Sequence, residues 1–286
     1  MTERLSRRKL LMLTGGAILG LTGRPVSGSE GDEKLTIGSV FQPDPDGKYR
    51  IGIPGIVVDK GELPSRSPLI TERPNWPKEV LLKSIRQGPA DRPLIGLTVD
   101  DAFLARGEVL DALVSKNVKA TFFMIGRIAA SDPGFIKRAL DLGYEFGNHT
   151  FSHGDLTRMT PDQMRVDIKR GQEAMLAVDA RAQTAPFLRP PGGARNSATD
   201  LAGADMGFRS INWNVSGDTG ATYTSDQLVR LYLNDQIDKM KNPWGSILLI
   251  HFNARTASGL LGIIDGLRVR NLEPVSLSKL FEGDRI

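Results

Sequence analysis

The chain has 286 residues, enough for one large domain or two small ones, and its 40% apolar and 24% charged residues are typical of a globular protein with a sizeable core. It contains no cysteine, which excludes disulfides, thiolate metal sites and cysteine nucleophiles. Residues 1–28 hold five basic residues and one acidic residue and so carry the whole net charge of +4. The remainder is neutral and gives no indication of a nucleic-acid partner or of a stable membrane partner.

Residues 1–28 predict an export signal. Arg7 and Arg8 precede an apolar run from Leu10 to Leu21, and small residues suited to cleavage follow. The run is too short to span a bilayer, which requires about 20 apolar residues. The arginine pair is typical of the twin-arginine route of bacteria, with an uncleaved anchor or an ordinary secretory signal as alternatives. We therefore expect a periplasmic or extracellular protein.

Residues 29–91 differ from the rest of the chain because they are rich in proline and glycine. Short apolar pieces at 49–53 and 56–58 predict a small strand pair. We interpret this segment as an irregular arm or linker and not as an independent fold, since its composition favours turns. The catalytic domain is then expected over residues 92–286.

From about Pro93 onward, short apolar runs alternate with helical patterns. Helices are expected at 109–116, from Pro133 to Leu142, at 161–180 behind a capping box that begins at Thr160, and at 225–240. Strands are expected at 94–99, 120–124, 145–148, 187–189, 209–212, 246–251 and near Val275. This alternation predicts an α/β fold with about seven parallel strands, either a barrel or an open sheet.

Two carboxylates and two imidazoles follow strands of this sheet. Asp100 and Asp101 end the first strand, and His149 and His153 follow the third. A spacing of four places both imidazoles on one face of a helical turn, and one carboxylate completes a two-histidine, one-carboxylate set. Such a set holds zinc, with cobalt, iron, manganese or nickel as alternatives. The alternative interpretations are that the two histidines face solvent and that the two adjacent aspartates are only a turn signal.

The chain's remaining histidine, His251, ends the buried run 247–251, and Arg189 ends another strand. The C-terminal edge of a parallel sheet is where ligands bind in α/β folds. A carboxylate beside a metal-bound water can act as a base, and His251 is a natural general acid there. A histidine after an apolar run is otherwise usually a structural residue.

Four ordered motifs over residues 93–282 resemble the polysaccharide deacetylase (NodB-homology) family of carbohydrate esterases. The family's Thr-Phe-Asp-Asp-Gly is matched by 98–102, its His-[Ser/Thr]-x-x-His by 149–153, its Arg-x-Pro-Tyr-Gly by 189–193 and its Leu-x-His by 249–251. Each motif is weak alone, but four in order are specific. The resemblance implies a distorted (β/α) barrel and hydrolysis of an acetyl group, N-acetyl before O-acetyl, on a sugar polymer.

The resemblance also implies roles for individual residues. Asp100 would be the catalytic base, and Asp101, His149 and His153 the metal ligands. His251 would protonate the leaving group. Arg189 would hold the base and the Gly192 N–H would stabilise the oxyanion. The residues expected to bind substrate are Leu249, Trp213 and Asp218.

Three departures from the family pattern concern the substrate pocket. Ala102 replaces a glycine and is expected to narrow the pocket, Gly192 replaces a tyrosine wall, and the motif around Trp213 lacks a second tryptophan. These departures keep two alternatives open: a hydrolase of small amide or formyl C–N bonds, and a non-catalytic glycan-binding relative. The ligand set alone would also suit an iron oxygenase. The polymer and the oligomeric state do not follow from the sequence.

Overall fold

The computed structural model describes residues 49–50, 57–58, 76–184, 186–219 and 223–283. The expected export signal lies outside these residues. In the arm, the predicted strand pair is confirmed in part, since β1 (Tyr49–Arg50) pairs antiparallel with β2 (Val57–Val58). Within the described residues, no helix combines the length and the apolar character that a bilayer crossing requires.

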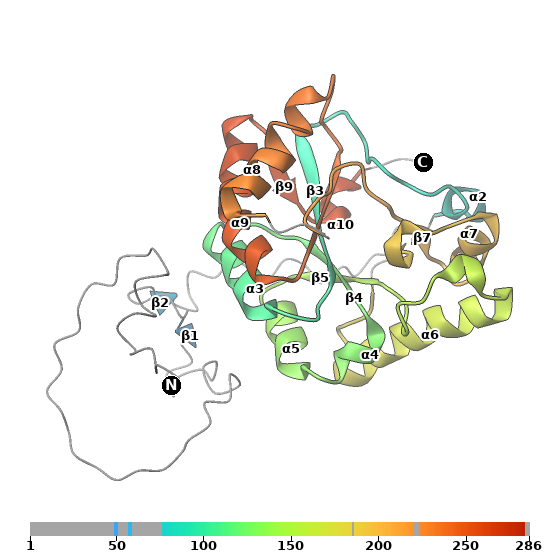
Figure 1. Cartoon of the computed structure of the whole chain (residues 1–286). Coiled ribbons are helices and arrows are strands. Elements are labelled where there is room, and N and C mark those ends of the chain that lie inside the picture. Colours follow the sequence, from blue (N-terminus) through green and yellow to red (C-terminus); the bar gives the residue numbers. More distant parts are fainter. Residues whose placement is uncertain (1–48, 51–56, 59–75, 185, 220–222, 284–286) are drawn as a thin grey trace, which may run out of the picture. The chain divides into compact units, whose positions relative to one another are not determined.

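A sheet of seven parallel strands carries the fold (Figure 1). Its order is β7-β6-β5-β4-β3-β8, and β9 pairs with the first half of β3. Its strands are β3 (Leu94–Asp101), β4 (Thr121–Met124), β5 (Glu145–Asn148), β6 (Phe187–Leu188), β7 (Arg209–Ser210), β8 (Ile247–His251) and β9 (Glu273–Val275). All seven lie at the predicted strand positions. The sheet curls into a half-barrel, which confirms the predicted distorted (β/α) barrel.

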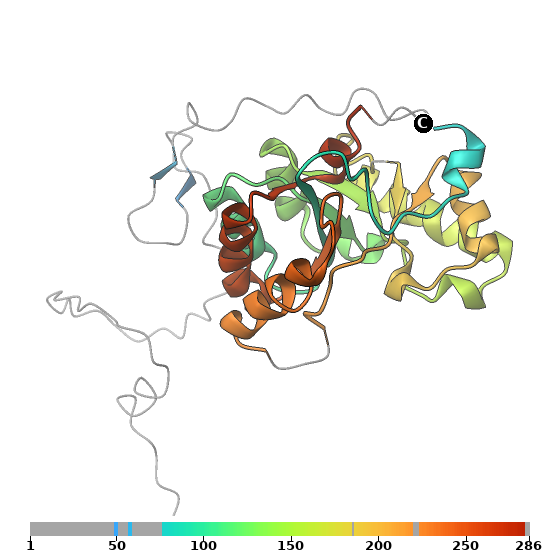
Figure 2. The ribbon, with the colours of Figure 1, turned by 90° about the horizontal axis from the view of Figure 1, so that it is seen from above.

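Helices connect the strands, as parallel pairing requires. The α-helices are α2 (Lys78–Leu81), α3 (Arg106–Ser115), α4 (Gly126–Ala129), α5 (Pro133–Asp141), α6 (Pro161–Val178), α7 (Ser197–Ala204), α8 (Ser225–Leu233), α9 (Ala254–Val269) and α10 (Leu277–Leu280). Short 3-10 turns are η2 (Leu156–Arg158), η3 (Pro191–Gly193) and η4 (Ile237–Lys239). Figure 2 shows α8 and α9 at one end of the sheet and α6 and α7 at the other.

Local signals explain two helix ends. The Thr160 hydroxyl accepts from Gln163 N while the Gln163 side chain accepts from Thr160 N, which confirms the predicted capping box of α6. The prediction that one helix runs from 225 to 240 is wrong, because α8 ends at Leu233. The Gln236 side chain instead donates to the carbonyls of Ser216 and Leu231, which ties the chain to the neighbouring loop.

The two faces of the sheet have separate cores. Alternate strand residues point to opposite faces. The outer face packs on α3, α5, α8 and α9, with Leu97, Val99, Phe122, Leu248 and Ile250 among its buried residues. Toward the N-terminal ends of the strands, the inner face is covered by α2, α10 and aromatic side chains, including Trp76, Phe123, Phe187, Leu280 and Phe281. Toward the C-terminal ends of the strands, the inner face carries polar groups.

Candidate metal centre and surrounding site

The C-terminal ends of β3, β5, β6 and β8 bring the suspected side chains to one edge of the sheet. β3 and β8 are neighbours in register, with Asp100 opposite His251. Asn148 is paired with Leu188, so the residues that follow them, His149 and Arg189, leave the sheet side by side. Segments far apart in the chain therefore meet because parallel strands share a direction.

Asp101 meets both neighbouring histidines. Its Oδ1 lies 3.3 Å from His149 Nε2 and 3.2 Å from His153 Nε2. The ligand atoms of all three residues lie within 4.8 Å of one another. Zinc bonds of about 2.0–2.2 Å place neighbouring ligand atoms about 3–3.5 Å apart, so one cation can bridge this set.

Left-handed backbone positions create this convergence. Asp101 has φ 79, which turns the end of β3 and lets Asp100 and Asp101 face one site although they are adjacent. His149 and His153 do not lie on a helical turn, so that part of the prediction is wrong. Thr150 and His153 both have φ 61, and the chain doubles back through an irregular loop. The geometry of this loop, and not a helical turn, brings the two imidazoles together.

The hydrogen bonding of His149 determines which nitrogen can bind a cation. Its Nδ1 lies 2.7 Å from the Arg189 carbonyl oxygen, and a carbonyl can only accept, so Nδ1 carries the proton. The lone pair of Nε2 then faces Asp101 Oδ1, a buried oxygen without a hydrogen bond among the described residues. Two acceptors face each other, and a positive ion between them resolves the conflict. The residues present therefore fit a divalent metal.

Charge also favours an ionised Asp101. Burial alone would raise the pKa of its carboxyl, but the close approach of His149 and His153 outweighs burial and holds the pKa well below its usual range. The carboxylate is thus ionised and available as a metal ligand at neutral pH.

Asp100 is held by a buried ion pair. Arg189 Nη1 donates to Asp100 Oδ1 at 2.9 Å, and both side chains are almost fully buried. Arg189 also donates through Nε to the Ile211 carbonyl at 2.6 Å and lies over the Phe123 ring at 4.3 Å. Burial lowers the pKa of Arg189 while the charge of Asp100 opposes that shift. The second oxygen, Asp100 Oδ2, lies 3.8 Å from His149 Nε2, which places this carboxylate beside the candidate metal ligands.

His251 is oriented by Asp218. Its Nδ1 lies 2.8 Å from Asp218 Oδ1, and Asp218 Oδ2 accepts from the His251 N–H at 2.6 Å and from the Thr256 hydroxyl at 2.7 Å. Burial would lower the pKa of His251, but the hydrogen bond and charge of Asp218 raise it above its usual value. The His251 side chain remains 20% exposed, so its Nε2 can face a ligand.

The structure corrects the substrate-binding role that we predicted for Asp218. Its side chain is 1% exposed, and its contacts are with His251, Asn253 and Thr256. Thr256 was missed in the sequence. The only local signal was Asn253, which caps α9 by accepting from Thr256 N and so fixes Thr256 beside Asp218.

The residues predicted to shape the pocket lie close to these groups. Gly192 has φ 60 and open space where a side chain would stand, while Gly193 packs against Trp213. Trp213 lies beside Arg189, with 5.3 Å from its ring to the guanidinium. Leu249 is paired with Thr98 on β3, two residues before His251, and therefore points to the inner face. Ala102 does not narrow the pocket as we expected, because it is buried in the outer core.

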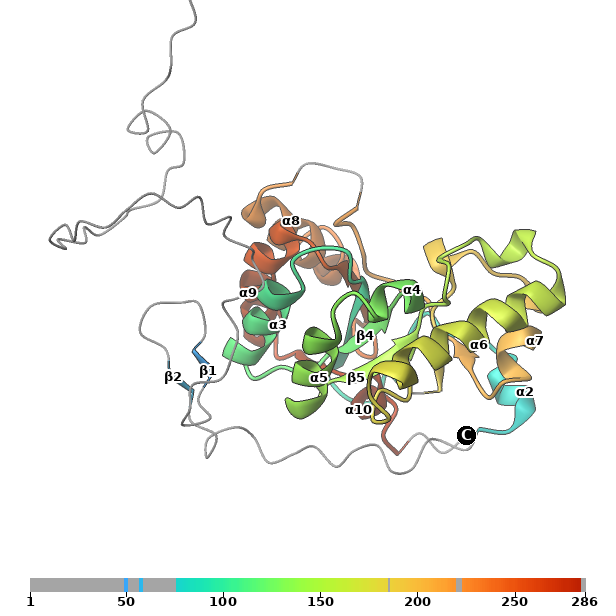
Figure 3. The same ribbon diagram turned by 90° about the horizontal axis from the view of Figure 1, so that it is seen from below.

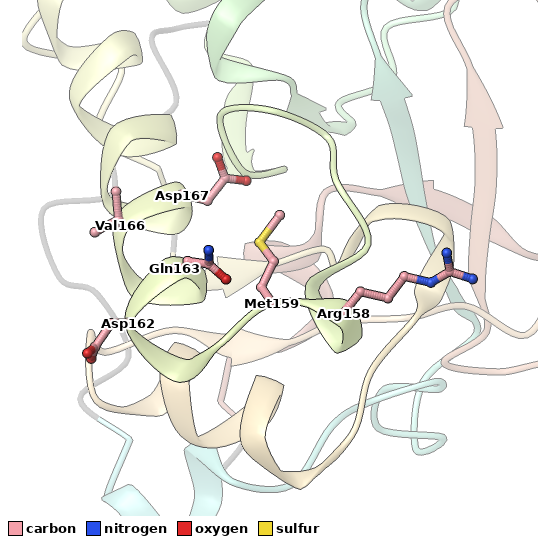
Figure 4. Close-up of a pocket in the computed structure, with 6 residues that line it drawn as sticks. All are labelled: Arg158, Met159, Asp162, Gln163, Val166 and Asp167. Carbon is pink, nitrogen blue, oxygen red and sulfur yellow. The ribbon is translucent and has the colours of Figure 1, made fainter.

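Figure 4 shows an open hollow on another part of the described surface. Its lining comes from the η2 turn and the first turns of α6: Arg158, Met159, Asp162, Gln163, Val166 and Asp167. None of the candidate ligands or catalytic groups lines it.

The chain is thus an α/β half-barrel with a candidate three-ligand metal site and an oriented histidine at the C-terminal edge of its sheet. Residues 87–211 match the family model described as polysaccharide deacetylase. This part of the chain belongs to that family. The matched range contains the candidate metal ligands, Asp100 and Arg189, and ends before the Asp218–His251 pair.

Individual relatives are consistent with this membership. A bifunctional xylanase/deacetylase of Pseudobutyrivibrio xylanivorans is 32% identical over 200 residues, covering 67% of this chain and 31% of that protein. A peptidoglycan-N-acetylglucosamine deacetylase of Bacillus cereus is 28% identical over 205 residues, covering 69% of this chain and 72% of the relative. The solved structure of a mutant CE4 family pseudoenzyme with restored enzymatic activity gives a TM-score of 0.63 at 26% identity, covering 69% of this chain and 71% of that chain. The chain thus spans less than a third of the first relative and most of the second.

Proposed function

We propose that this protein is an exported, metal-dependent hydrolase that removes acetyl groups from a cell-wall or extracellular polysaccharide, with N-acetyl groups preferred to O-acetyl groups. One observation carries the proposal. Asp101 Oδ1 lies unpaired between two imidazole nitrogens, beside a second carboxylate that a buried arginine holds in place. This combination supports hydrolysis at a cation site, since it supplies both ligands and a separate base.

Asp101, His149 and His153 would hold the divalent ion, with zinc as the first choice for two imidazoles and a carboxylate. A bound ion would supply positive charge for a carbonyl oxygen and lower the pKa of water. A catalytic ion also requires open coordination positions. His153 and Asp101 have side chains 30% and 21% exposed, so the cluster opens toward solvent on the side where a substrate would enter.

Asp100 would take the proton of the attacking water. Its carboxylate is fixed by Arg189, and the Thr98 hydroxyl accepts from the same guanidinium at 3.2 Å. A fixed base loses no orientation when the substrate arrives, and a positioned general base contributes typically 10²–10⁴-fold to rate. Asp100 and Asp101 would thus have different roles. Arg189 pairs with Asp100, which would be the base, and the two histidines face Asp101, which would be a metal ligand.

His251 would give a proton to the departing nitrogen or oxygen. Asp218 raises the pKa of His251 and contacts its Nδ1, which leaves Nε2 as the free ring nitrogen. Because Asp100 and His251 are opposite each other on neighbouring strands, a base and an acid flank one position at the edge of the sheet. General acid and base chemistry on a single tetrahedral centre requires this arrangement.

The remaining residues would shape the acetyl and sugar pocket. The Gly192 N–H would donate to the developing oxyanion, an interaction worth roughly 3–4 kcal/mol in a water-excluded site. Leu249 would line the slot for the methyl group, and Trp213 would form a wall beside Arg189. The space at Gly192 makes the pocket open on one side, which favours a polymer over a small, enclosed substrate.

The names of the relatives suggest peptidoglycan as the polymer to test first. The matched part of the chain is the shared deacetylase region, whereas the first relative is much longer than this chain. The expected export signal agrees with a cell-wall substrate, which lies outside the cytoplasm.

The test is acetate release from peptidoglycan, chitin oligomers and acetylated xylan. We expect release from one of them, loss of release after chelation, and recovery on adding zinc. His149→Ala and Asp100→Asn should each lower turnover at least about 100-fold. The matched control is Asp162→Asn, an exposed carboxylate on α6, which should remain active. Full activity of both site variants, or substrate binding without any acetate release, would refute the proposal.

A further inference from the structure

The loop that carries both histidines is backbone-strained and is held in place by other elements. Thr150 and His153 adopt left-handed φ values of 61, which cost about 1–2 kcal/mol for residues with a Cβ. Such strain persists only where surrounding groups determine the conformation. The His153 N–H donates to the Thr150 hydroxyl at 3.1 Å, which is the loop's own contribution.

α4 holds the first half of this loop. Gly126 N donates to the Thr150 carbonyl at 2.9 Å, and Arg127 N donates to the Phe151 carbonyl at 3.1 Å. α4 and α6 lie against each other (Figure 3), and a Cβ on Gly126 would come within 2.7 Å of Gly171 on α6. The loop is therefore seated against two closely packed helices.

α6 holds the second half through Asp167. Its carboxylate accepts from Ser152 N at 3.1 Å and from Ser152 Oγ at 2.9 Å, and its backbone carbonyl accepts from Phe151 N. Ser152 is the residue directly before His153. Figure 4 shows the Asp167 side chain leaving α6 toward this loop, at the edge of the hollow. Both donors of the residue before a candidate ligand thus end on one carboxylate.

Asp167 is a buried carboxylate on an otherwise apolar helix face, which is unusual for a residue with a purely structural role. It is 7% exposed, and it lies on the face of α6 that also buries Met164, Ile168 and Gly171. Among the described residues, no cationic side chain lies within ion-pair distance of it. A buried carboxylate without a cationic partner is costly, so its two bonds to Ser152 are its main compensation.

We propose that Asp167 is a positioning residue of the metal centre: it fixes the backbone at Ser152 and so directs the His153 imidazole toward Asp101. This inference rests on the proposed function, because it requires that His153 binds a metal. Groups that orient metal ligands typically affect metal affinity by 10–100-fold when they are removed. Asp167 would act only through the loop backbone, because its hydrogen bonds to the loop are with Ser152 and Phe151.

The experiment measures zinc affinity of the purified full chain by competition with a chromophoric chelator. Asp167→Asn should weaken zinc binding by about 10–100-fold. The unfolding midpoint of the metal-free protein and its far-UV circular dichroism report separately on folding. Asp167→Glu, which keeps the carboxylate, should recover part of the affinity. The matched control is Asp200→Asn on α7, an equally buried carboxylate that pairs with Arg195 and not with the loop, and it should bind zinc like the wild type.

A second variant covers the case in which Asp167→Asn does not fold. Ser152 is exposed, and Ser152→Ala removes only the hydroxyl that donates to the Asp167 carboxylate. We therefore expect a loss of about threefold to tenfold in zinc affinity. The cobalt-loaded form should show an altered visible spectrum in both variants if the ligand geometry changes. Equal zinc affinity of wild type, Asp167→Asn and Ser152→Ala removes this inference alone. No zinc binding by the wild-type chain removes the proposed function and this inference with it.

Discussion

Replacing Arg189 with methionine would test whether the buried ion pair determines the stability of the site. Arg189 is fully buried and Asp100 is 4% exposed, so neither charge can recover hydration when its partner is removed. Removing one member of a buried pair typically costs about 3–5 kcal/mol. The Ile211 carbonyl also loses its donor at 2.6 Å, a loss that overlaps with the first. We expect the free energy of unfolding to fall by about 4 kcal/mol, a large part of the usual 5–15 kcal/mol.

The assay is urea unfolding followed by circular dichroism at neutral pH. It should include Asp100→Asn and the double variant, which removes both charges. The double variant should be more stable than the sum of the two losses predicts, with a coupling energy of about 2 kcal/mol or more. Arg165→Met serves as control, because its ion pairs with Asp162 and Asp205 are at the surface and should contribute at most about 1 kcal/mol.

Two results would contradict a stabilising role of the Asp100–Arg189 ion pair. A loss below about 1 kcal/mol in Arg189→Met would mean that the buried carboxylate finds another partner or is hydrated. Strict additivity in the double variant would mean that Arg189 stabilises the fold through its other contacts, such as the stacking on Phe123, and not through the carboxylate.

Two further changes test the acid and the strand that carries it. Asp218→Asn should lower the pKa of His251, because the charge that raises it is lost while burial, which lowers it, remains. Since only protonated His251 can donate, the alkaline limb of the kcat/KM profile should move to lower pH, and an unmoved limb would contradict this role. Tyr232→Phe removes the hydroxyl that donates to the Leu249 carbonyl at 2.7 Å, so urea unfolding should show a loss of about 1–3 kcal/mol. An unchanged midpoint would mean that the carbonyl finds another donor.

Much of the local structure follows from the order of the residues alone. Apolar runs located β3, β4 and β8, because a strand buried on both faces requires a continuous apolar run. The capping box at Thr160 and Gln163 located the start of α6 for the same local reason. The scarcity of histidine and the absence of cysteine narrowed the possible ligands to very few side chains.

Tertiary structure alone decided how those side chains face one another. The sheet order brings Asp100 opposite His251 although a long stretch of chain separates them, and no local pattern encodes that neighbourhood. The loop between His149 and His153 takes left-handed turns that packing against α4 and α6 imposes, against the preference of Thr150 itself. The Asp218–His251 pair arises in the same way. Residue type is a local property, whereas the direction of a side chain depends on contacts between distant segments.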